Sequence, residues 1–420
     1  GKNYYVSLEA NVQNPNFQNE AIYPEMKYPD AGYRLLALYR YWNIIQYYFP
    51  YKNLIEEDWK EVLGEFIPKF VNAKNELEYK LTVLELIARV HDTHANIWGW
   101  DMTLNHYWGI RISAIELNFI ENKAVVTGYY DEELGKKTGL IKGDNIVKIN
   151  NKTVDDIIKE RLKYTPASNY PTQLRDLSTK ILRTNDTLLN LEFIRNGQIQ
   201  AKNIEAYSLK EINIYKKYQQ KDTCLKFINE DIAYLYLGSI KNSYLSNIFE
   251  KIKDTKGLII DLRCYPSDFV VFTLGQYLLP EKTPFVRFSG GSLINAGRFT
   301  FTDCLEVGRE NKEYYKGKVV ILVNETTQSQ AEYTAMALRV SPKATVIGST
   351  TAGADGNVSS FYLPGKIKTT ISGIGVYYPN KQETQRIGIV PDIKVLPTIK
   401  GIIDDKDEVL EKAIDLIEEK

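Results

Sequence analysis

Ser329 stands where a run of β-forming residues gives way to a helix-forming pattern, and a serine at such a junction could serve in two ways. The motif Ser329-Gln-Ala-Glu332 fits a capping box, in which the serine caps the helix and the glutamate bonds back to the cap. The same position suits a nucleophile, because backbone N–H groups at a helix N-terminus are free and the helix dipole favours negative charge. An oxyanion formed by attack of Ser329 would find donors there. These residues alone leave cap and nucleophile both open.

A nucleophilic serine needs a base, and the chain contains three histidines. His94 follows a helix-forming stretch and stands next to Thr93, with His91 and Asp92 just before them. An imidazole titrates near neutrality, so a histidine needs no burial to act as a base, unlike lysine. The competing interpretation makes His94 a surface or capping histidine and Asp92 a turn residue. His106 precedes a strand pattern and is interpreted as structural.

A helical region is predicted over residues 28–100 and would hold the histidines in place. Its apolar residues recur at three- and four-residue spacing over 31–48, 56–71 and 76–91. The helix pattern ends near the histidines, so we expect this region to contribute to the active site. Residues 1–27 are interpreted as a lead-in, and the start at glycine rather than methionine indicates a processed or truncated chain.

Residues 105–205 predict a separate β-rich unit. The stretch HYWGIRISAIELNFIENKAVVTGY alternates like a hairpin, and Asn196-Gly197 is a strong hairpin turn. The segment GLIKGDNIVKINNKTV combines a turn, an alternating strand and a second turn. This unit resembles a PDZ domain, which holds a peptide C-terminus by strand addition.

The pattern over residues 206–420 predicts an α/β domain. Short aliphatic runs such as GLIIDLR and KVVILVN alternate with helix-like segments at 241–254, 268–279 and 329–341. Near-continuous aliphatic strands alternating with helices indicate a buried, largely parallel sheet.

The composition excludes several other classes of function. The net charge is +0 over 420 residues, which argues against a nucleic-acid partner. No apolar run approaches the length of a membrane span. Cys224, Cys264 and Cys304 lie far apart, so they allow at most one disulfide or remain free thiols, and they form no zinc-like pattern. We expect no metal and no cofactor.

Four motifs occur in an order that resembles a known peptidase family. They are ARVHDTHANI, LIIDLRCYPSD, SQAE and RIGIVPDIKV. Together with the unit order they resemble the C-terminal-processing and tricorn-core serine peptidases, peptidase family S41, over nearly the whole chain after residue 28. The resemblance implies an α/β catalytic domain of the crotonase/ClpP-like kind, with a helical N-terminal region and an inserted PDZ-like domain.

The resemblance makes Ser329 the nucleophile and restricts the choice of base. One branch of the family pairs its serine with a lysine, but Ala354 and Asp355 stand at that place here. Lys366 and Lys368 lie further on, in a strand-like segment where we expect them to be solvated.

The tricorn-like branch instead uses a histidine next to a hydroxyl residue, which His94 and Thr93 match, and His91 is the alternative base. That branch orients the imidazole with a glutamate before the Gly-x-x-Pro-Asp segment. Glu383 is the only acid there, although Gln385 falls nearer the expected position, so both stay open.

The oxyanion hole implied by the resemblance would use the backbone N–H of Gln330 and a second donor after DLR. The turn CYPSD replaces the glycine-rich turn of the family, and Pro266 has no N–H to give. The second donor is therefore Tyr265 or Ser267.

The function implied is that of a bacterial, exported, tail-specific type of serine endopeptidase acting on peptides or unfolded proteins. The PDZ-like unit would bind or gate the substrate. The alternative is a catalytically inactive peptide-binding protein of the same fold, favoured by the altered CYPSD turn. A hydratase-type enzyme of similar fold would need an acyl-CoA pocket, for which the sequence gives no support.

Overall fold

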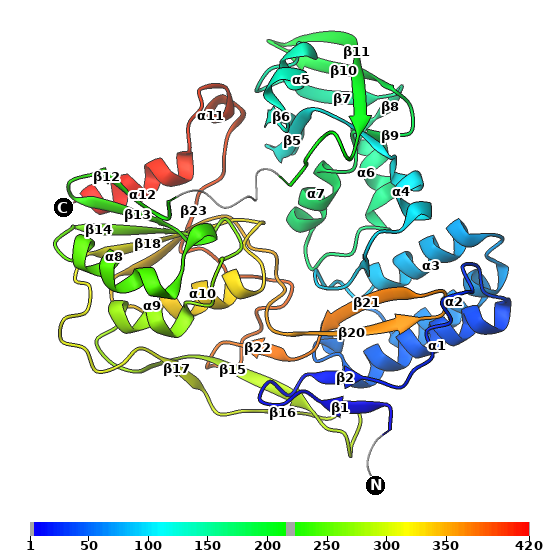
Figure 1. Cartoon of the computed structure of the whole chain (residues 1–420), viewed down its shortest axis with the longest axis horizontal. Coiled ribbons are helices and arrows are strands. Elements are labelled where there is room, and N and C mark those ends of the chain that lie inside the picture. The colour runs from blue at the N-terminus through cyan, green and yellow to red at the C-terminus, as the bar shows by residue number, and fades with distance from the viewer. Residues whose placement is uncertain (1–3, 216–222, 420) are drawn as a thin grey trace.

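The computed structural model describes residues 4–215 and 223–419, and a six-stranded sheet lies at the centre of its C-terminal half (Figure 1). Its strand order is β12-β13-β14-β18-β19-β23, with β12 antiparallel to its neighbour and the other strands parallel. The strands are β12 (Leu225–Asn229), β13 (Ile232–Tyr236), β14 (Gly257–Asp261), β18 (Lys318–Val323), β19 (Ala344–Gly348) and β23 (Ile393–Lys394). The mixed α/β fold predicted from the aliphatic runs is confirmed.

Helices cover both faces of this sheet, as its aliphatic strands require. Every residue of β14 is buried, and α12 (Glu408–Glu418) packs across β14, β18 and β19. The opposite face carries α8 (Leu245–Ile252), α9 (Val271–Leu278) and α10 (Gln330–Leu338) (Figure 1). Because β14 and β18 are parallel neighbours, their carboxyl ends meet at one edge. Open α/β sheets form their ligand sites at such edges.

The N-terminal helices share their core with strands from the other end of the chain. These helices are α1 (Ala31–Tyr48), α2 (Trp59–Asn72) and α3 (Glu76–Ala88). They pack against a three-stranded sheet of β20 (Val358–Leu363), β21 (Ile367–Ser372) and β3 (Ile97–Trp98). Phe361 and Ile371 belong to the same buried cluster as Tyr41 and Phe66. A late segment therefore completes the core of the early helices.

Residues 111–208 hold an eight-stranded sheet in which no described strand pairs with the parallel sheet. Its order is β5-β6-β7-β10-β11-β4-β9, with β8 on β7. The strands are β4 (Arg111–Ser113), β5 (Ile115–Ile120), β6 (Lys123–Tyr129), β7 (Asn145–Ile149), β8 (Lys152–Thr153), β9 (Arg183–Thr184), β10 (Leu188–Arg195) and β11 (Gln198–Ser208). The accompanying helices are α4 (Met102–Trp108), α5 (Glu132–Lys137), α6 (Val154–Leu162) and α7 (Tyr170–Ser178). Asn196 and Gly197 both have positive φ in the predicted hairpin turn.

The segment interpreted as a lead-in contains a short hairpin of β1 (Val6–Leu8) and β2 (Pro15–Phe17). The side-chain amide of Asn14 donates to Val358 O at 3.0 Å and to Ser359 Oγ at 3.3 Å, which fixes the hairpin on β20. A further antiparallel sheet consists of β15 (Thr283–Gly291), β16 (Phe299–Phe301), β17 (Leu305–Val307) and β22 (Gly375–Tyr377), and α11 (Ile399–Ile403) precedes the last helix.

Within 4–215 and 223–419, no helix has both the length and the apolar character needed to cross a membrane. The same residues contain no group of three or more His, Cys, Asp or Glu able to hold a metal ion. All three cysteines are free thiols.

Candidate active site

Ser329 is the N-cap residue of α10, at the end of the turn that follows β18. Its φ is 55° and its ψ is −119°, a conformation that residues with a Cβ rarely adopt. Such strain costs on the order of 1–3 kcal/mol and persists only where the surroundings enforce it. A serine in a strained strand-to-helix turn is also the arrangement that exposes the nucleophile in α/β-hydrolases. Ser329 and Glu332 have the capping-box arrangement as well, so the two interpretations of this serine are compatible.

A buried carboxylate holds this turn in place. Glu332 Oε2 accepts from the backbone N–H groups of Ser329 and Ala354, each at 3.1 Å. Its Oε1 accepts from the Gly353 N–H at 2.8 Å and from the Thr351 hydroxyl. Burial raises the pKa of Glu332, although these four donors favour its charged form. Glu332 therefore ties the start of α10 to the loop that follows β19.

Two of the three proposed oxyanion donors are unengaged. Among the backbone hydrogen bonds of the described residues, the N–H groups of Gln330 and Tyr265 have no acceptor. Both residues line the same cavity as Ser329. Ser267 instead donates its N–H to Leu237 O at 3.0 Å, so that donor is occupied. The wall around Ser329 thus contains two residues whose N–H groups are available.

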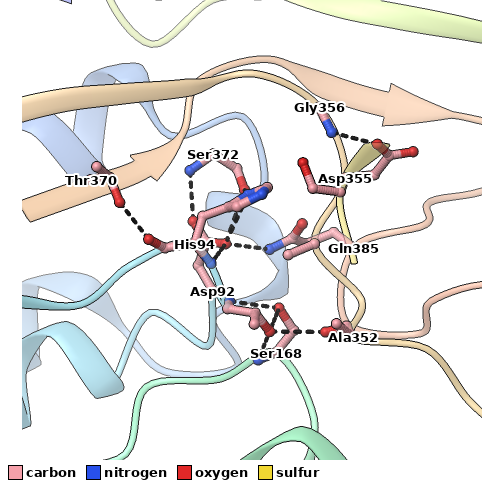
Figure 2. A network of polar contacts seen from close by, with 12 residues as sticks. Asp92, His94, Ser168, Ala352, Asp355, Gly356, Thr370, Ser372 and Gln385 are labelled. Atoms are coloured by element: carbon pink, nitrogen blue, oxygen red, sulfur yellow. Dashed lines mark hydrogen bonds and ion pairs between the residues drawn. The ribbon is translucent and has the colours of Figure 1, made fainter. Parts of the chain in front are cut away.

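The imidazole of His94 lies beside the end of β21. Strand β3 pairs with β21 through Ile97 and Thr369, which brings the turn after α3 next to Ser372. Figure 2 shows the resulting contacts: His94 Nδ1 lies 2.9 Å from Ser372 Oγ, and the same hydroxyl lies 2.9 Å from Asp92 Oδ1. One hydroxyl therefore bridges the carboxylate and the imidazole.

The partners of Asp92 fix the direction of these hydrogen bonds. Asp92 accepts from the backbone N–H of His94 at 3.1 Å, the backbone N–H of Ser372 at 2.6 Å and the Gln385 side-chain amide at 3.2 Å. Because an ionised carboxylate only accepts, the Ser372 hydroxyl must donate to it. That hydroxyl then accepts from Nδ1–H of His94, which leaves Nε2 as the unprotonated nitrogen. His94 Nε2 is buried and has no partner among the described residues.

The surroundings keep this imidazole neutral. His94 is buried, and burial lowers its pKa, while the negative charge of Asp92 offsets part of that effect. A neutral imidazole with a free, unprotonated Nε2 has the protonation state that a general base requires.

Of the other residues suggested around the imidazole, Gln385 joins its hydrogen-bond network, and Thr93 and Glu383 make other contacts. The Thr93 hydroxyl donates to Ala352 O at 2.9 Å and bonds Ser168 Oγ at 3.0 Å, so its partners are not the imidazole. Glu383 forms a strand bridge with Tyr377, and no hydrogen bond joins its side chain to His94 among the described residues. Gln385 contacts Asp92 and so belongs to the network.

Among the described residues, none of the alternative bases hydrogen-bonds to the network of Asp92, Ser372 and His94. Lys366 and Lys368 are exposed near the turn between β20 and β21, and no lysine lines the cavity beside Ser329. His91 has a φ of 54°, and burial followed by the charge of Arg386 lowers its pKa. His106 is exposed on α4, where its Nδ1 lies 2.9 Å from a backbone carbonyl of that helix.

Ser329 and His94 are connected through one loop. No hydrogen bond joins the two side chains among the described residues. Ala354 O accepts from the Ser329 N–H at 3.0 Å, and Ala352 O accepts from the Thr93 hydroxyl at 2.9 Å. The serine turn and the histidine turn therefore bind carbonyls two residues apart.

Sequence reasoning identified the segment of β21 as β structure but missed the role of Ser372. Residues at i and i+2 of a strand share a face, and here Thr370 and Ser372 both contact His94, Thr370 through a hydrogen bond from its hydroxyl to the His94 carbonyl. A polar pair on one face of a buried strand was the available signal.

A cavity of about 250 Å³ lies beside Ser329. Its walls are mainly apolar and aromatic and come from six parts of the chain. They are formed by Val12, Tyr265, Phe269, Phe288, Ser329, Gln330, Tyr333, Asp355, Gly356, Asn357 and Ile374. Val12 belongs to the tip of the N-terminal hairpin, so that hairpin reaches the site.

Several solved structures share this fold. Mature CPAF in complex with lactacystin superposes with a TM-score of 0.69 at 12% identity, over 92% of this chain and 98% of that one. The CPAF S499A mutant gives a TM-score of 0.70 at 11% identity, over 92% and 96%. A peptidase candidate from Parabacteroides merdae ATCC 43184 gives a TM-score of 0.57 at 18% identity, over 93% and 97%. At these identities the likeness shows the fold alone.

Sequence comparison adds the family. A search of curated protein sequences finds no match to this chain. The model of peptidase family S41 matches residues 231–395, which include β14, Ser329, Asp355 and Ser372. The chain therefore carries a domain of peptidase family S41.

Proposed function

We propose that this protein is a serine endopeptidase of the tricorn-like branch, with Ser329 as nucleophile and His94 as general base. The observation that carries the proposal is the position of Ser329. It is a strained N-cap serine in the wall of a cavity that also holds two residues with unengaged N–H groups. A helix cap alone requires neither the positive φ nor the cavity.

The choice of His94 rests on its protonation state. Its Nε2 is free and unprotonated because the Asp92–Ser372 bridge holds the proton on Nδ1. Lys366 and Lys368 are exposed, and like His94 they do not line the cavity, so the preference for His94 comes from its network and not from the cavity lining. Gln385 supports the bridge through Asp92, which makes it a better candidate than Glu383 for the third position.

In this mechanism Ser329 Oγ attacks the carbonyl carbon of the scissile bond while His94 Nε2 takes the hydroxyl proton. The N–H groups of Gln330 and Tyr265 stabilise the negative charge on the carbonyl oxygen. The imidazolium then protonates the leaving amine, the C–N bond breaks, and the acyl group stays on Ser329. Water, deprotonated by the same imidazole, cleaves the ester and releases the acid.

We further propose that residues 105–205 form a PDZ-like unit, inserted between the helical region and a catalytic domain of the crotonase/ClpP-like kind. This unit would bind the substrate or gate its access to the site. The support is the hydrogen-bonded contact between Ser168, which lies between α6 and α7, and the Thr93 backbone and hydroxyl next to His94. From the family resemblance alone, we also propose export from a bacterial cell, which cell fractionation tests.

The direct test is hydrolysis of an unfolded protein substrate by matched variants. Ser329→Ala and His94→Ala should each lower kcat/KM by on the order of 10⁴-fold or more, because nucleophile and base act as a unit. His91→Ala, Lys366→Met and Lys368→Met are the controls and should keep most activity. Full loss with His91→Ala and retention with His94→Ala would reassign the base. A folded wild-type protein that binds peptides and cleaves none would instead be a catalytically inactive peptide-binding protein.

A further inference from the structure

Asp355 is a buried acid with one unpartnered oxygen in the wall of the cavity beside Ser329. The residue is 1% exposed and lines that cavity. Its Oδ1 accepts from the Gly356 N–H at 2.6 Å, as Figure 2 shows. Its Oδ2 is buried and has no hydrogen-bond partner among the described residues. An orphaned buried carboxyl oxygen costs free energy that a bound donor would recover.

The electrostatic surroundings of Asp355 are negative or neutral. Burial, followed by the charge of Glu332, raises its pKa well above the usual range. The charge of Asp355 in turn adds to burial in raising the pKa of Tyr333, so the carboxyl acts on a ring of the cavity wall. No ion pair between Asp355 and a lysine, arginine or histidine occurs in the described part of the chain, and none of these residue types lines the cavity.

Aromatic rings in the cavity wall provide a second feature that suits a cation. The Tyr333 ring is stacked near two others, with centroids 6.2 Å from Phe269 at 21° and 6.2 Å from Phe288 at 24°. Phe269 remains 49% exposed, so part of this surface is open to a ligand. The faces of aromatic rings attract cations.

These observations favour one class of substrate side chain. A purely apolar side chain would fill the cavity but leave Asp355 Oδ2 unpaired. A hydroxyl would satisfy the oxygen but would bring no charge to balance an ionised Asp355. An ammonium or guanidinium group would donate to Oδ2, balance the charge of an ionised Asp355 and lie against the rings, while its alkyl stem contacts the apolar walls.

We propose that this cavity binds a lysine or arginine side chain that flanks the scissile bond, and that Asp355 determines this specificity. The proposal rests on the proposed peptidase function and names its substrate class. With a volume of about 250 Å³ the cavity has room for a side chain rather than a single water, whose share is about 30 Å³.

The test compares peptides that are identical except for lysine or its neutral analogue norleucine next to the cleaved bond, with one pair for each side of that bond. In the wild type, kcat/KM for one lysine peptide should exceed that for its norleucine partner by at least roughly 10-fold. Asp355→Asn keeps the shape but removes the acid that a bound cation would hold in its ionised form, and it should bring that ratio close to one while norleucine cleavage changes little. Asp303→Asn, an exposed acid outside the cavity, is the matched control.

A binding experiment tests this inference independently of the proposed peptidase activity. Calorimetry with Ser329→Ala, which cannot form the acyl-enzyme, should show the same lysine preference, and adding Asp355→Asn should remove it. Preference without any wild-type cleavage would support the cavity assignment and reject the peptidase. Cleavage with norleucine, tyrosine or phenylalanine preferred over lysine and arginine, or a ratio unchanged by Asp355→Asn, would overturn the proposal.

Discussion

At the scale of single residues, the Ser372 hydroxyl determines which ring nitrogen of His94 carries the proton. Ser372 Oγ lies 2.9 Å from both Asp92 Oδ1 and His94 Nδ1, and it has one proton to give. Because Ser372 uses its proton in a hydrogen bond to Asp92, its oxygen accepts a hydrogen bond from His94 Nδ1–H. The other ring nitrogen, Nε2, is then free of a proton. The carboxylate thus acts on the imidazole through Ser372, at 3.8 Å from Nδ1, rather than by a direct hydrogen bond.

Removing the bridge should therefore impair turnover more than binding. Ser372→Ala leaves Nδ1 without an acceptor, so the imidazole can adopt either tautomer, and kcat should fall roughly 10- to 10³-fold with little change in KM. Ser372→Thr keeps the hydroxyl and should retain most activity. Nitrogen-15 NMR of the His94 ring reports the cause: the wild type should show Nδ1 protonated, and Ser372→Ala should show a mixture. An unchanged tautomer with lost activity would contradict this role.

The pH dependence should follow the lowered pKa of His94. Only the neutral imidazole accepts a proton, so activity should fall as pH drops through a pKa below the ordinary histidine value of about 6.5. Asp92 raises that pKa, so Asp92→Asn should move the acid limb of kcat/KM to still lower pH in whatever activity remains. The free energy of unfolding should change in the same direction as the activity. His94 binds its proton more readily in the unfolded chain than in the folded protein, so stability is lost as pH falls below about 6.5. A limb above the ordinary value would contradict the buried, neutral imidazole.

At the scale of elements, local patterns could be predicted and distant pairings could not. The apolar spacing over 31–48 predicted α1 at Ala31–Tyr48, where Asp30 caps the first turn. Helix α10 begins one residue after the predicted cap. By contrast, β3 has two residues and pairs with a strand about 270 positions later, through Trp98 and Lys368. No local signal encodes that register, so the polar pair Thr370 and Ser372 could mark a functional strand face but could not identify His94 as its partner.

The two buried acids near the start of α10 should respond oppositely to neutralisation. Glu332 accepts hydrogen bonds from four donors. In Glu332→Gln an NH₂ group replaces one carboxylate oxygen and points its own N–H groups at some of these donors, so the substitution should lower the free energy of unfolding by about 1–3 kcal/mol. Asp355 has one donor and a raised pKa, so its charge costs stability as pH rises above the unfolded value of about 4. Asp355→Asn should therefore unfold at higher denaturant than wild type at neutral pH, with the gain shrinking near pH 4. Equal destabilisation by both changes would contradict this contrast.

At the scale of the whole molecule, the site exists only when distant segments assemble. The histidine turn follows α3, Ser372 ends β21, and Ser329 follows β18. Because β20 and β21 complete the core of the helical region, that region and the C-terminal half of the chain are structurally interdependent. The N-terminal hairpin adds Val12 to the cavity.

This interdependence predicts that the helical region does not fold by itself. A fragment of residues 28–100 lacks Phe361, Leu363, Ile367 and Ile371, which are buried with its helices in the full chain. Losing large core side chains costs about 2–5 kcal/mol each, comparable to the total stability of a small domain. Circular dichroism should show weak helicity and no cooperative thermal transition. A cooperative melt of the isolated fragment would show that the late strands are dispensable.

The claim that Ser329 is a nucleophile activated by His94 can be tested most directly by covalent labelling with a fluorophosphonate, followed by peptide mapping. We expect one adduct per chain, located on Ser329, with no labelling of Ser329→Ala and labelling of His94→Ala slowed by on the order of 10³-fold or more. A wild-type protein that is folded and stays unlabelled, or an adduct on a residue other than Ser329, would contradict the account.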